Sequence, residues 1–146
     1  MEGFFYKEQE KKTASVPKKR QSFNTIQKDP CQLCSLCDQR ALRNPKIEPY
    51  GEGGKGILVW GESPGEEEDL HGIPFKGKVG RMFRPYFGRY GIDFDEDCIT
   101  VNALDCRPPD NRRPTKKEIK CCYPRKRKVL EEYNPKVIFL LGESAI

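Results

Sequence analysis

The segment from Gly61 to Gly77 gathers acidic side chains, glycines and one aromatic ring directly after an apolar run. The apolar run at 57–60 has the sequence Ile-Leu-Val-Trp, which is typical of a parallel strand buried on both faces. In an α/β protein, ligands bind beyond the carboxyl ends of such strands. At Gly61, Ser63 and Gly65 the main chain could approach a ligand closely enough for N–H groups to bind a carbonyl oxygen. We therefore expect a pocket at this end of the strand.

Cysteines form the second group of residues that could do chemistry. Seven are present, an odd number that includes closely spaced pairs, which favours metal ligation in a reducing compartment over a complete disulfide framework. A Cys-x-x-Cys turn such as 31–34 lets two sulfurs reach one metal centre, and soft thiolates suit an iron–sulfur cluster. Four cysteines could also hold Zn²⁺ in a tetrahedron, and spacing alone does not separate these metals.

Three apolar runs must position these residues, at 57–60, 98–101 and 137–141. Each predicts a buried parallel strand. The first and third end in similar sequences, Trp60-Gly61-Glu62-Ser63 and Leu141-Gly142-Glu143-Ser144, so we expect both ends to face one cleft. Helical patterns separate the strands, and right-handed crossovers then predict a short parallel sheet with helices on both faces, a three-layer α/β/α fold.

Two helices are predicted between the strands. Apolar residues from Val79 to Tyr90 have the spacing of one helix face, and Pro85 among them predicts a kink or a late start. Thr115 and Glu118 have the spacing of a capping box, which predicts that the second helix begins there.

The segment 61–77 resembles motif A and the following pocket loop of the iron–sulfur, or family 4, uracil-DNA glycosylases. That motif is typically Gly-Glu-Ala-Pro-Gly-x-x-Glu-Asp-x-x-Gly-x-Pro-Phe-Val-Gly, from which only Ser63 and Lys76 depart. A second block, from Asn102 through Cys106-Arg107-Pro108-Pro109 to Cys122-x-Pro124, also has the family's residues at the family's spacing. The resemblance covers residues 31–146. It implies a uracil-DNA glycosylase-like domain that hydrolyses the N-glycosidic bond of uracil in DNA, in base-excision repair.

The resemblance also implies roles for individual residues. Phe75 matches the aromatic residue on which a flipped uracil stacks, with burial in the core as the alternative. Asn102 matches the residue that pairs with the uracil edge, since an amide both donates and accepts. Glu62 and Glu68 match the motif's acids and would position water or stabilise the sugar cation, although 66–69 could equally be a solvated acidic turn. The substrate-binding residues expected on this basis are Gly61, Ser63, Gly65, Phe75 and Asn102.

By the same resemblance, four cysteines would ligate a 4Fe–4S cluster, namely Cys31, Cys34, Cys106 and Cys122, with zinc as the alternative. Cys122 is preferred to Cys121 because the family pattern Glu-Ile-x-x-Cys-x-Pro fits 118–124. Cys37 and Cys121 would be spare thiols, and Cys98 a small buried hydrophobe within a strand. We expect the cluster to staple the N-terminal segment to the helix after Cys106.

The family normally continues past the equivalent of Gly142 into a His-Pro-Ser segment and a DNA-inserting loop, so we expect a C-terminally incomplete domain. The family's catalytic histidine lies in that segment, and His71, the only histidine here, occupies a variable family position. Because losing a charge-stabilising donor costs about 10²–10³ in rate, this chain could bind without cutting efficiently. The run 137–141 would also form an open sheet edge, which invites pairing with a partner.

Bulk composition fits a soluble, intracellular DNA-binding protein. The net charge is +5, and basic clusters such as Arg125–Lys128 suit a polyanion, or equally a solvated surface. Residues 1–29 resemble a disordered basic tail, in which Phe4-Phe5-Tyr6 could dock a protein partner or have no function. No apolar run approaches the roughly 18 residues of a membrane span, and no signal peptide is evident. The alternatives to a glycosylase are a non-catalytic iron–sulfur module that binds nucleic acid or a partner protein, and a zinc-binding structural protein.

Overall fold

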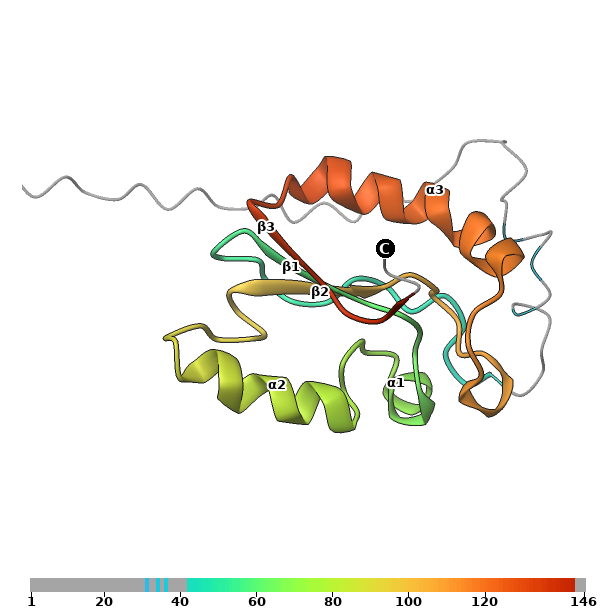
Figure 1. Cartoon of the computed structure of the whole chain (residues 1–146), viewed down its shortest axis with the longest axis horizontal. Coiled ribbons are helices and arrows are strands. Elements are labelled where there is room, and N and C mark those ends of the chain that lie inside the picture. The colour runs from blue at the N-terminus through green and yellow to red at the C-terminus, as the bar shows by residue number, and fades with distance from the viewer. Residues whose placement is uncertain (1–30, 32–33, 35, 37–41, 144–146) are drawn as a thin grey trace, which may run out of the picture.

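Three parallel strands form the sheet at the centre of the domain (Figure 1). The structure is a computed structural model that describes residues 31, 34, 36 and 42–143. The strands are β1 (Ile57–Gly61), β2 (Cys98–Asn102) and β3 (Val137–Leu140), in the order β2-β1-β3. The parallel sheet predicted from the apolar runs is therefore confirmed. The expectations for residues 1–29 and for Cys37 concern positions outside the described residues.

Helices cover both faces of this sheet, as the alternating pattern predicted. Helices α1 (Glu66–His71) and α2 (Lys78–Gly88) lie on one face, and α3 (Lys116–Tyr133) lies on the other (Figure 1). A short 3₁₀ helix, η2 (Pro109–Asn111), leads into α3. The three-layer α/β/α arrangement is thus confirmed.

The two long helices agree with the sequence signals in part. The α3 capping box is confirmed, because Glu118 N–H donates to Thr115 Oγ1 at 3.3 Å and Thr115 N–H donates to Glu118 Oε2 at 2.8 Å. The late start that Pro85 suggested for α2 is wrong, since this helix begins at Lys78 and continues through Pro85.

Helix α1 occupies the acidic stretch that the sequence suggested could be a solvated turn. Four acidic residues fill its first turn, where they interact favourably with the helix dipole. The helix ends at Gly72, which has a positive φ of 68° and forms a left-handed cap.

Two apolar layers hold the helices on the sheet, because successive strand residues point to opposite faces. On the α2 face, Ile57, Val59 and Cys98 pack with Phe75 and Phe94. On the α3 face, Leu58, Ile99 and Val101 pack with Val129. Cys98 is fully buried, which confirms its predicted place in the core.

The predicted apolar face of α2 is only half used. Phe83 and Phe87 pack on the core, whereas Val79, Met82 and Tyr86 remain about half exposed. The pattern alone could not show this, because the spacing of apolar residues does not reveal how much of the helix the three described strands cover.

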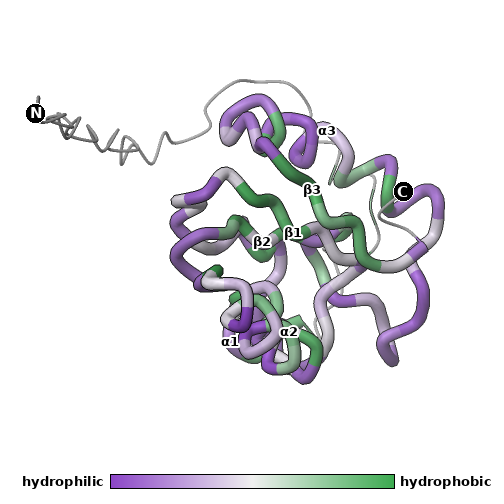
Figure 2. Tube along the Cα trace, turned by 60° about the vertical axis from the view of Figure 1, so that its left-hand side comes forward, coloured by the Kyte–Doolittle hydropathy of each residue, from purple (hydrophilic) through white to green (hydrophobic). Residues whose placement is uncertain are grey.

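Strand β3 is an edge strand of the described sheet, and its four apolar residues are between 43% and 49% exposed. Figure 2 shows this hydrophobic stretch at the margin of the domain. The open edge expected at 137–141 is therefore present in the described part of the chain. Among the described helices, none has both the length and the hydropathy needed to cross a bilayer.

Candidate active site

Asn102 and Phe75 meet at Gly61, where the carboxyl ends of β1 and β2 lie side by side. Gly61 pairs with Asn102 in the parallel ladder. A Cβ atom on Gly61 would overlap Oδ1 of Asn102 and would lie 2.8 Å from Cζ of Phe75. Only glycine fits this position, because the side chains of Asn102 and Phe75 both approach its Cα. Three of the residues predicted for the substrate site are therefore brought together.

Asn102 is a buried residue, at 7% exposure. No group in the described part of the chain forms a hydrogen bond with it, so both its donor and its acceptor are available to a ligand. An amide can satisfy the adjacent acceptor and donor on the edge of a uracil ring.

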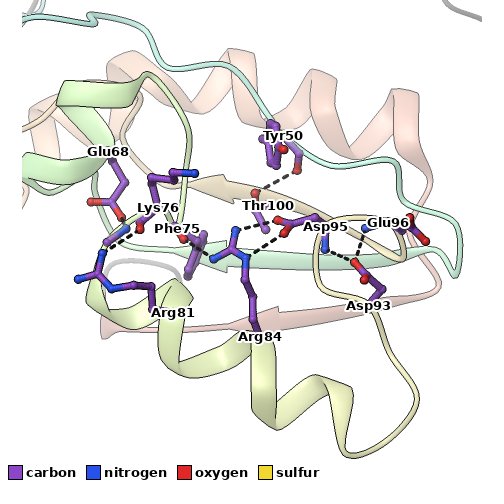
Figure 3. Close-up of polar contacts among 11 residues, drawn as sticks. Tyr50, Glu68, Phe75, Lys76, Arg81, Arg84, Asp93, Asp95, Glu96 and Thr100 are labelled. Carbon is purple, nitrogen blue, oxygen red and sulfur yellow. Dashed lines mark hydrogen bonds and ion pairs between the residues drawn. The ribbon is translucent and has the colours of Figure 1, made fainter.

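Phe75 has an uncommon backbone conformation. Its φ is +55°, a left-handed value that is costly for a bulky residue and is found mainly at functional sites. Its carbonyl accepts a hydrogen bond from Nη1 of Arg84 at 2.9 Å, which holds the loop (Figure 3). The ring is 6% exposed and contacts Phe94 edge to face at 5.9 Å between centroids. Phe75 is thus both a core residue and a neighbour of Asn102.

Glu68 holds the pocket loop together. Its Oε2 accepts the Gly65 N–H at 3.0 Å and its Oε1 accepts the Gly77 N–H at 2.6 Å. The N–H of Gly65, which the sequence suggested could bind substrate, is therefore bonded to Glu68. This contact joins the two ends of the segment 65–77.

Glu62 directly follows β1 and lies close to Gly142, which follows β3. A Cβ atom on Gly142 would lie 2.9 Å from Oε2 of Glu62, so the two similar strand ends do meet, as predicted. Within the described residues, no donor reaches the Glu62 carboxylate. Ser63 beside it is half-buried. Of the two predicted acids, Glu62 is the one left available for chemistry.

Buried thiols gather between α3 and the segment after β2. Cys34, Cys106, Cys121 and Cys122 share one core cluster with Leu36 and Leu104, and Cys31 is buried beside Cys34. The N–H of Lys46 donates to Sγ of Cys106 at 3.2 Å. The four predicted ligands are therefore buried in the same region.

Burial raises the pKa of the Cys122 thiol to about 12, and burial also raises the pKa of Cys121. Cys121 shares this core cluster with Cys34, so it lies among the predicted ligands although the sequence indicated a spare thiol. In the described part of the chain, no three His, Cys, Asp or Glu side chains converge on a point suited to a single metal ion. In a cluster of several irons each thiolate binds its own iron, so its ligands need not converge in that way.

Two residues of the basic run at 125–128, Arg125 and Lys126, form ion pairs within the fold, whereas Arg127 and Lys128 are exposed. Lys126 is 3% exposed and forms an ion pair with Asp105. Arg125 pairs with Asp105 at 2.7 Å and with Glu48 at 2.9 Å. Arg127 pairs with Glu131 at 2.9 Å. Three of these four basic residues therefore already have acidic partners.

Sequence reasoning missed two buried acids that support the site. Asp69, 2% exposed, accepts backbone N–H bonds from Arg43 and Asn44, and so ties α1 to the chain before β1. The second is Asp105, which directly precedes Cys106 and is also 2% exposed. Its partner Lys126 lies four residues after Cys122 and three before Val129, a helical spacing that could have shown it to face inward.

Comparisons with known proteins agree with this geometry. A family model described as the uracil DNA glycosylase superfamily matches residues 48–146. A type-4 uracil-DNA glycosylase from Archaeoglobus fulgidus is 36% identical over 112 residues, which are 77% of this chain and 56% of the relative. A type-4 uracil-DNA glycosylase from Thermotoga maritima is 34% identical over 127 residues, 87% of this chain and 66% of the relative. A type-4 uracil-DNA glycosylase from Saccharolobus solfataricus is 32% identical over 114 residues, which are 78% of this chain and 53% of the relative.

The chain thus spans between about half and two thirds of the length of these curated relatives. The family model nevertheless covers more than half of the chain, including Gly61, Phe75 and Asn102. On its motifs, its fold and this match, the chain belongs to the uracil DNA glycosylase superfamily.

Proposed function

We propose that this chain carries the base-recognition part of a uracil-DNA glycosylase, which hydrolyses the bond between uracil and deoxyribose in DNA. The observation that carries the proposal is the meeting of the Asn102 amide and the Phe75 ring at Gly61. An enzyme that acts on a base must take it out of the stack and read its edge in a fitted pocket. A side-chain amide that makes no hydrogen bond to the described residues, beside an aromatic ring, supplies both recognition elements.

The site residues then divide into two roles. Asn102 would donate to and accept from the uracil edge, Phe75 would provide the stacking surface, and Gly61 would leave room for both. Glu62, directly after β1, would position water or stabilise the positive charge that develops on the sugar. Glu68 acts through the loop, since its carboxylate already accepts the N–H groups of Gly65 and Gly77. It is a positioning residue.

We further propose a 4Fe–4S cluster on Cys31, Cys34, Cys106 and Cys122. The donor set fits, because these are soft thiols buried in one region of the domain. When bound, the cluster would supply a covalent staple between the turn at 31–34, the segment after β2 and α3. The residues of the uracil pocket do not include any of these thiols.

The proposed partner is DNA that contains uracil. A protein partner could add a strand to β3, because an edge strand presents unpaired backbone groups and the β3 side chains are apolar and exposed.

The test is uracil release from a uracil-containing oligonucleotide by the anaerobically purified chain. We expect Asn102→Ala to lower the rate by about 10²-fold or more, since it removes the edge-reading amide. Asn134→Gly is the matched control, because Asn134 is the left-handed cap of α3 at the opposite end of the sheet, where glycine is favoured. It should leave the rate unchanged.

Equal release by Asn102→Ala and the wild-type chain would remove the pocket assignment. Cluster-dependent DNA binding without any release would support the alternative, a non-catalytic iron–sulfur module.

A further inference from the structure

A groove of about 370 Å³ lies between α1, α2 and the outer side of β2. Neither Gly61, Phe75 nor Asn102 lines it, so it is separate from the uracil pocket. Its walls include Tyr50, Lys76, Arg81 and the pair formed by Arg84 and Asp95. On the α1 side, Glu67 also lines the groove, with its carboxylate 3.8 Å from the His71 ring. This volume is at the lower end of the range for small-ligand sites, about 300–1,000 Å³.

The back wall of the groove is rigid. Arg84 donates to both carboxylate oxygens of Asp95, at 2.9 and 2.7 Å, and to the Phe75 carbonyl at 2.9 Å (Figure 3). Tyr50 is clamped to β2, because its N–H donates to the Thr100 carbonyl at 3.1 Å and its carbonyl accepts the Thr100 N–H at 2.7 Å. The Tyr50 residue is nevertheless 41% exposed. Its backbone is fixed and its ring is available.

Two positive charges at the groove have no acidic partner among the described residues. Lys76 and Arg81 are both exposed, and the one hydrogen bond found between them runs from Nη1 of Arg81 to the Lys76 carbonyl at 3.4 Å. By contrast, the cation of Arg84 is matched by Asp95. Lys76 is also one of the two positions at which this chain departs from motif A, where the typical residue is valine.

We propose that this groove binds one nucleotide of single-stranded DNA, with its phosphate between Lys76 and Arg81 and its base on the Tyr50 ring. Cations that follow the backbone, together with an aromatic ring that stacks a base, are the combination that binds single strands without sequence preference. The choice of DNA as the polyanion rests on the proposed function. Lys76 directly follows Phe75, so the groove would hold the strand next to the nucleotide whose base enters the pocket.

The test is binding of a fluorescent, uracil-free oligothymidylate, measured by anisotropy over a range of salt concentrations. Lys76→Val and Arg81→Gln should each reduce the slope of log affinity against log salt by about 0.7, the value for one phosphate contact with a single strand. Tyr50→Leu should weaken binding about five- to 150-fold with the salt slope unchanged, and Tyr50→Phe should retain the wild-type affinity.

Lys136→Gln is the matched control, since Lys136 is an exposed lysine at the amino end of β3. Lys76→Val places the typical motif residue at an exposed position, so we expect it to fold, and thermal unfolding of each variant checks this. Affinity and slope equal to wild type in folded Lys76→Val and Arg81→Gln would overturn the proposal. Thymidine monophosphate that binds as tightly as the oligonucleotide would overturn the assignment to a strand.

Uracil release by the same variants separates this proposal from the proposed function. Wild-type chain that releases no uracil, with groove variants that still weaken DNA binding, would support the groove and contradict the glycosylase. Normal uracil release together with unchanged DNA binding in every groove variant would support the glycosylase and contradict the groove.

Discussion

Asp105 and Lys126 form an ion pair in which the two side chains are only 2% and 3% exposed. Asp105 lies in the segment after β2, next to Cys106, and Lys126 lies on α3, four residues after Cys122. The pair therefore joins two of the three parts of the chain that carry predicted cluster ligands, those with Cys106 and Cys122. A buried pair of this kind adds little stability by itself, but breaking it leaves an uncompensated charge.

We accordingly expect Asp105→Ala to lower the free energy of unfolding by about 3–5 kcal/mol, because Lys126 would remain buried without its carboxylate. Urea unfolding measures this. Glu131→Ala is the control, since it removes the exposed pair with Arg127 and should cost about 0.3–0.5 kcal/mol. The double variant Asp105→Asn/Lys126→Met should recover much of the loss. Equal effects of Asp105→Ala and Glu131→Ala would show that the buried pair is not needed.

Gly61→Ala should disrupt the uracil pocket. The added Cβ would overlap Oδ1 of Asn102 and crowd the Phe75 ring, so we expect uracil release to fall by about 10²-fold and stability by about 1–3 kcal/mol. Gly88→Ala is the matched control, because nothing lies within 4 Å of a Cβ placed there. Uracil release by Gly61→Ala at the wild-type rate would mean that Asn102 and Phe75 have room to move.

Glu118 should make stability depend on pH. Its hydrogen bond with Arg112 lowers the pKa of Glu118 below its ordinary value of 4.5. A lowered pKa in the folded state stabilises the protein above the ordinary pKa, and this contribution disappears as the pH falls through the folded-state pKa. The difference in urea stability between wild type and Glu118→Gln should therefore be constant near pH 7 and shrink below about pH 4.5. A difference that stays constant down to pH 3 would contradict the Arg112 pairing.

The two adjacent cysteines of α3 should differ in their effect on iron. Under the family pattern, Cys122→Ser should lower the iron content and the visible absorbance of anaerobic protein, whereas Cys121→Ser should keep both. Cys98→Ala is the control, since Cys98 is buried in the other core layer. Cys121 lies in the same core cluster as Cys34, which makes the reverse result informative, because iron lost only in Cys121→Ser would assign that thiol as the ligand.

The amino-acid sequence by itself determined the features that are written in short stretches of chain. The three strands are apolar runs, the start of α3 is a capping box of two residues three positions apart, and the pocket motif is contiguous from Gly61 to Gly77. Such signals depend on local spacing. They were enough to predict the order of elements, the parallel sheet, the family, and the neighbouring ends of β1 and β3.

Only the tertiary structure decided how the charged residues are used. Asp105 and Lys126 are 21 positions apart and meet only when α3 packs on the sheet. In the sequence, Lys126 therefore looks like one member of a basic surface run. Glu62 and Glu68 are equally acidic in sequence, yet only the Glu68 carboxylate accepts the N–H groups of Gly65 and Gly77. Burial and partnership of charges depend on contacts distant in the chain, and these contacts exist only in the folded domain.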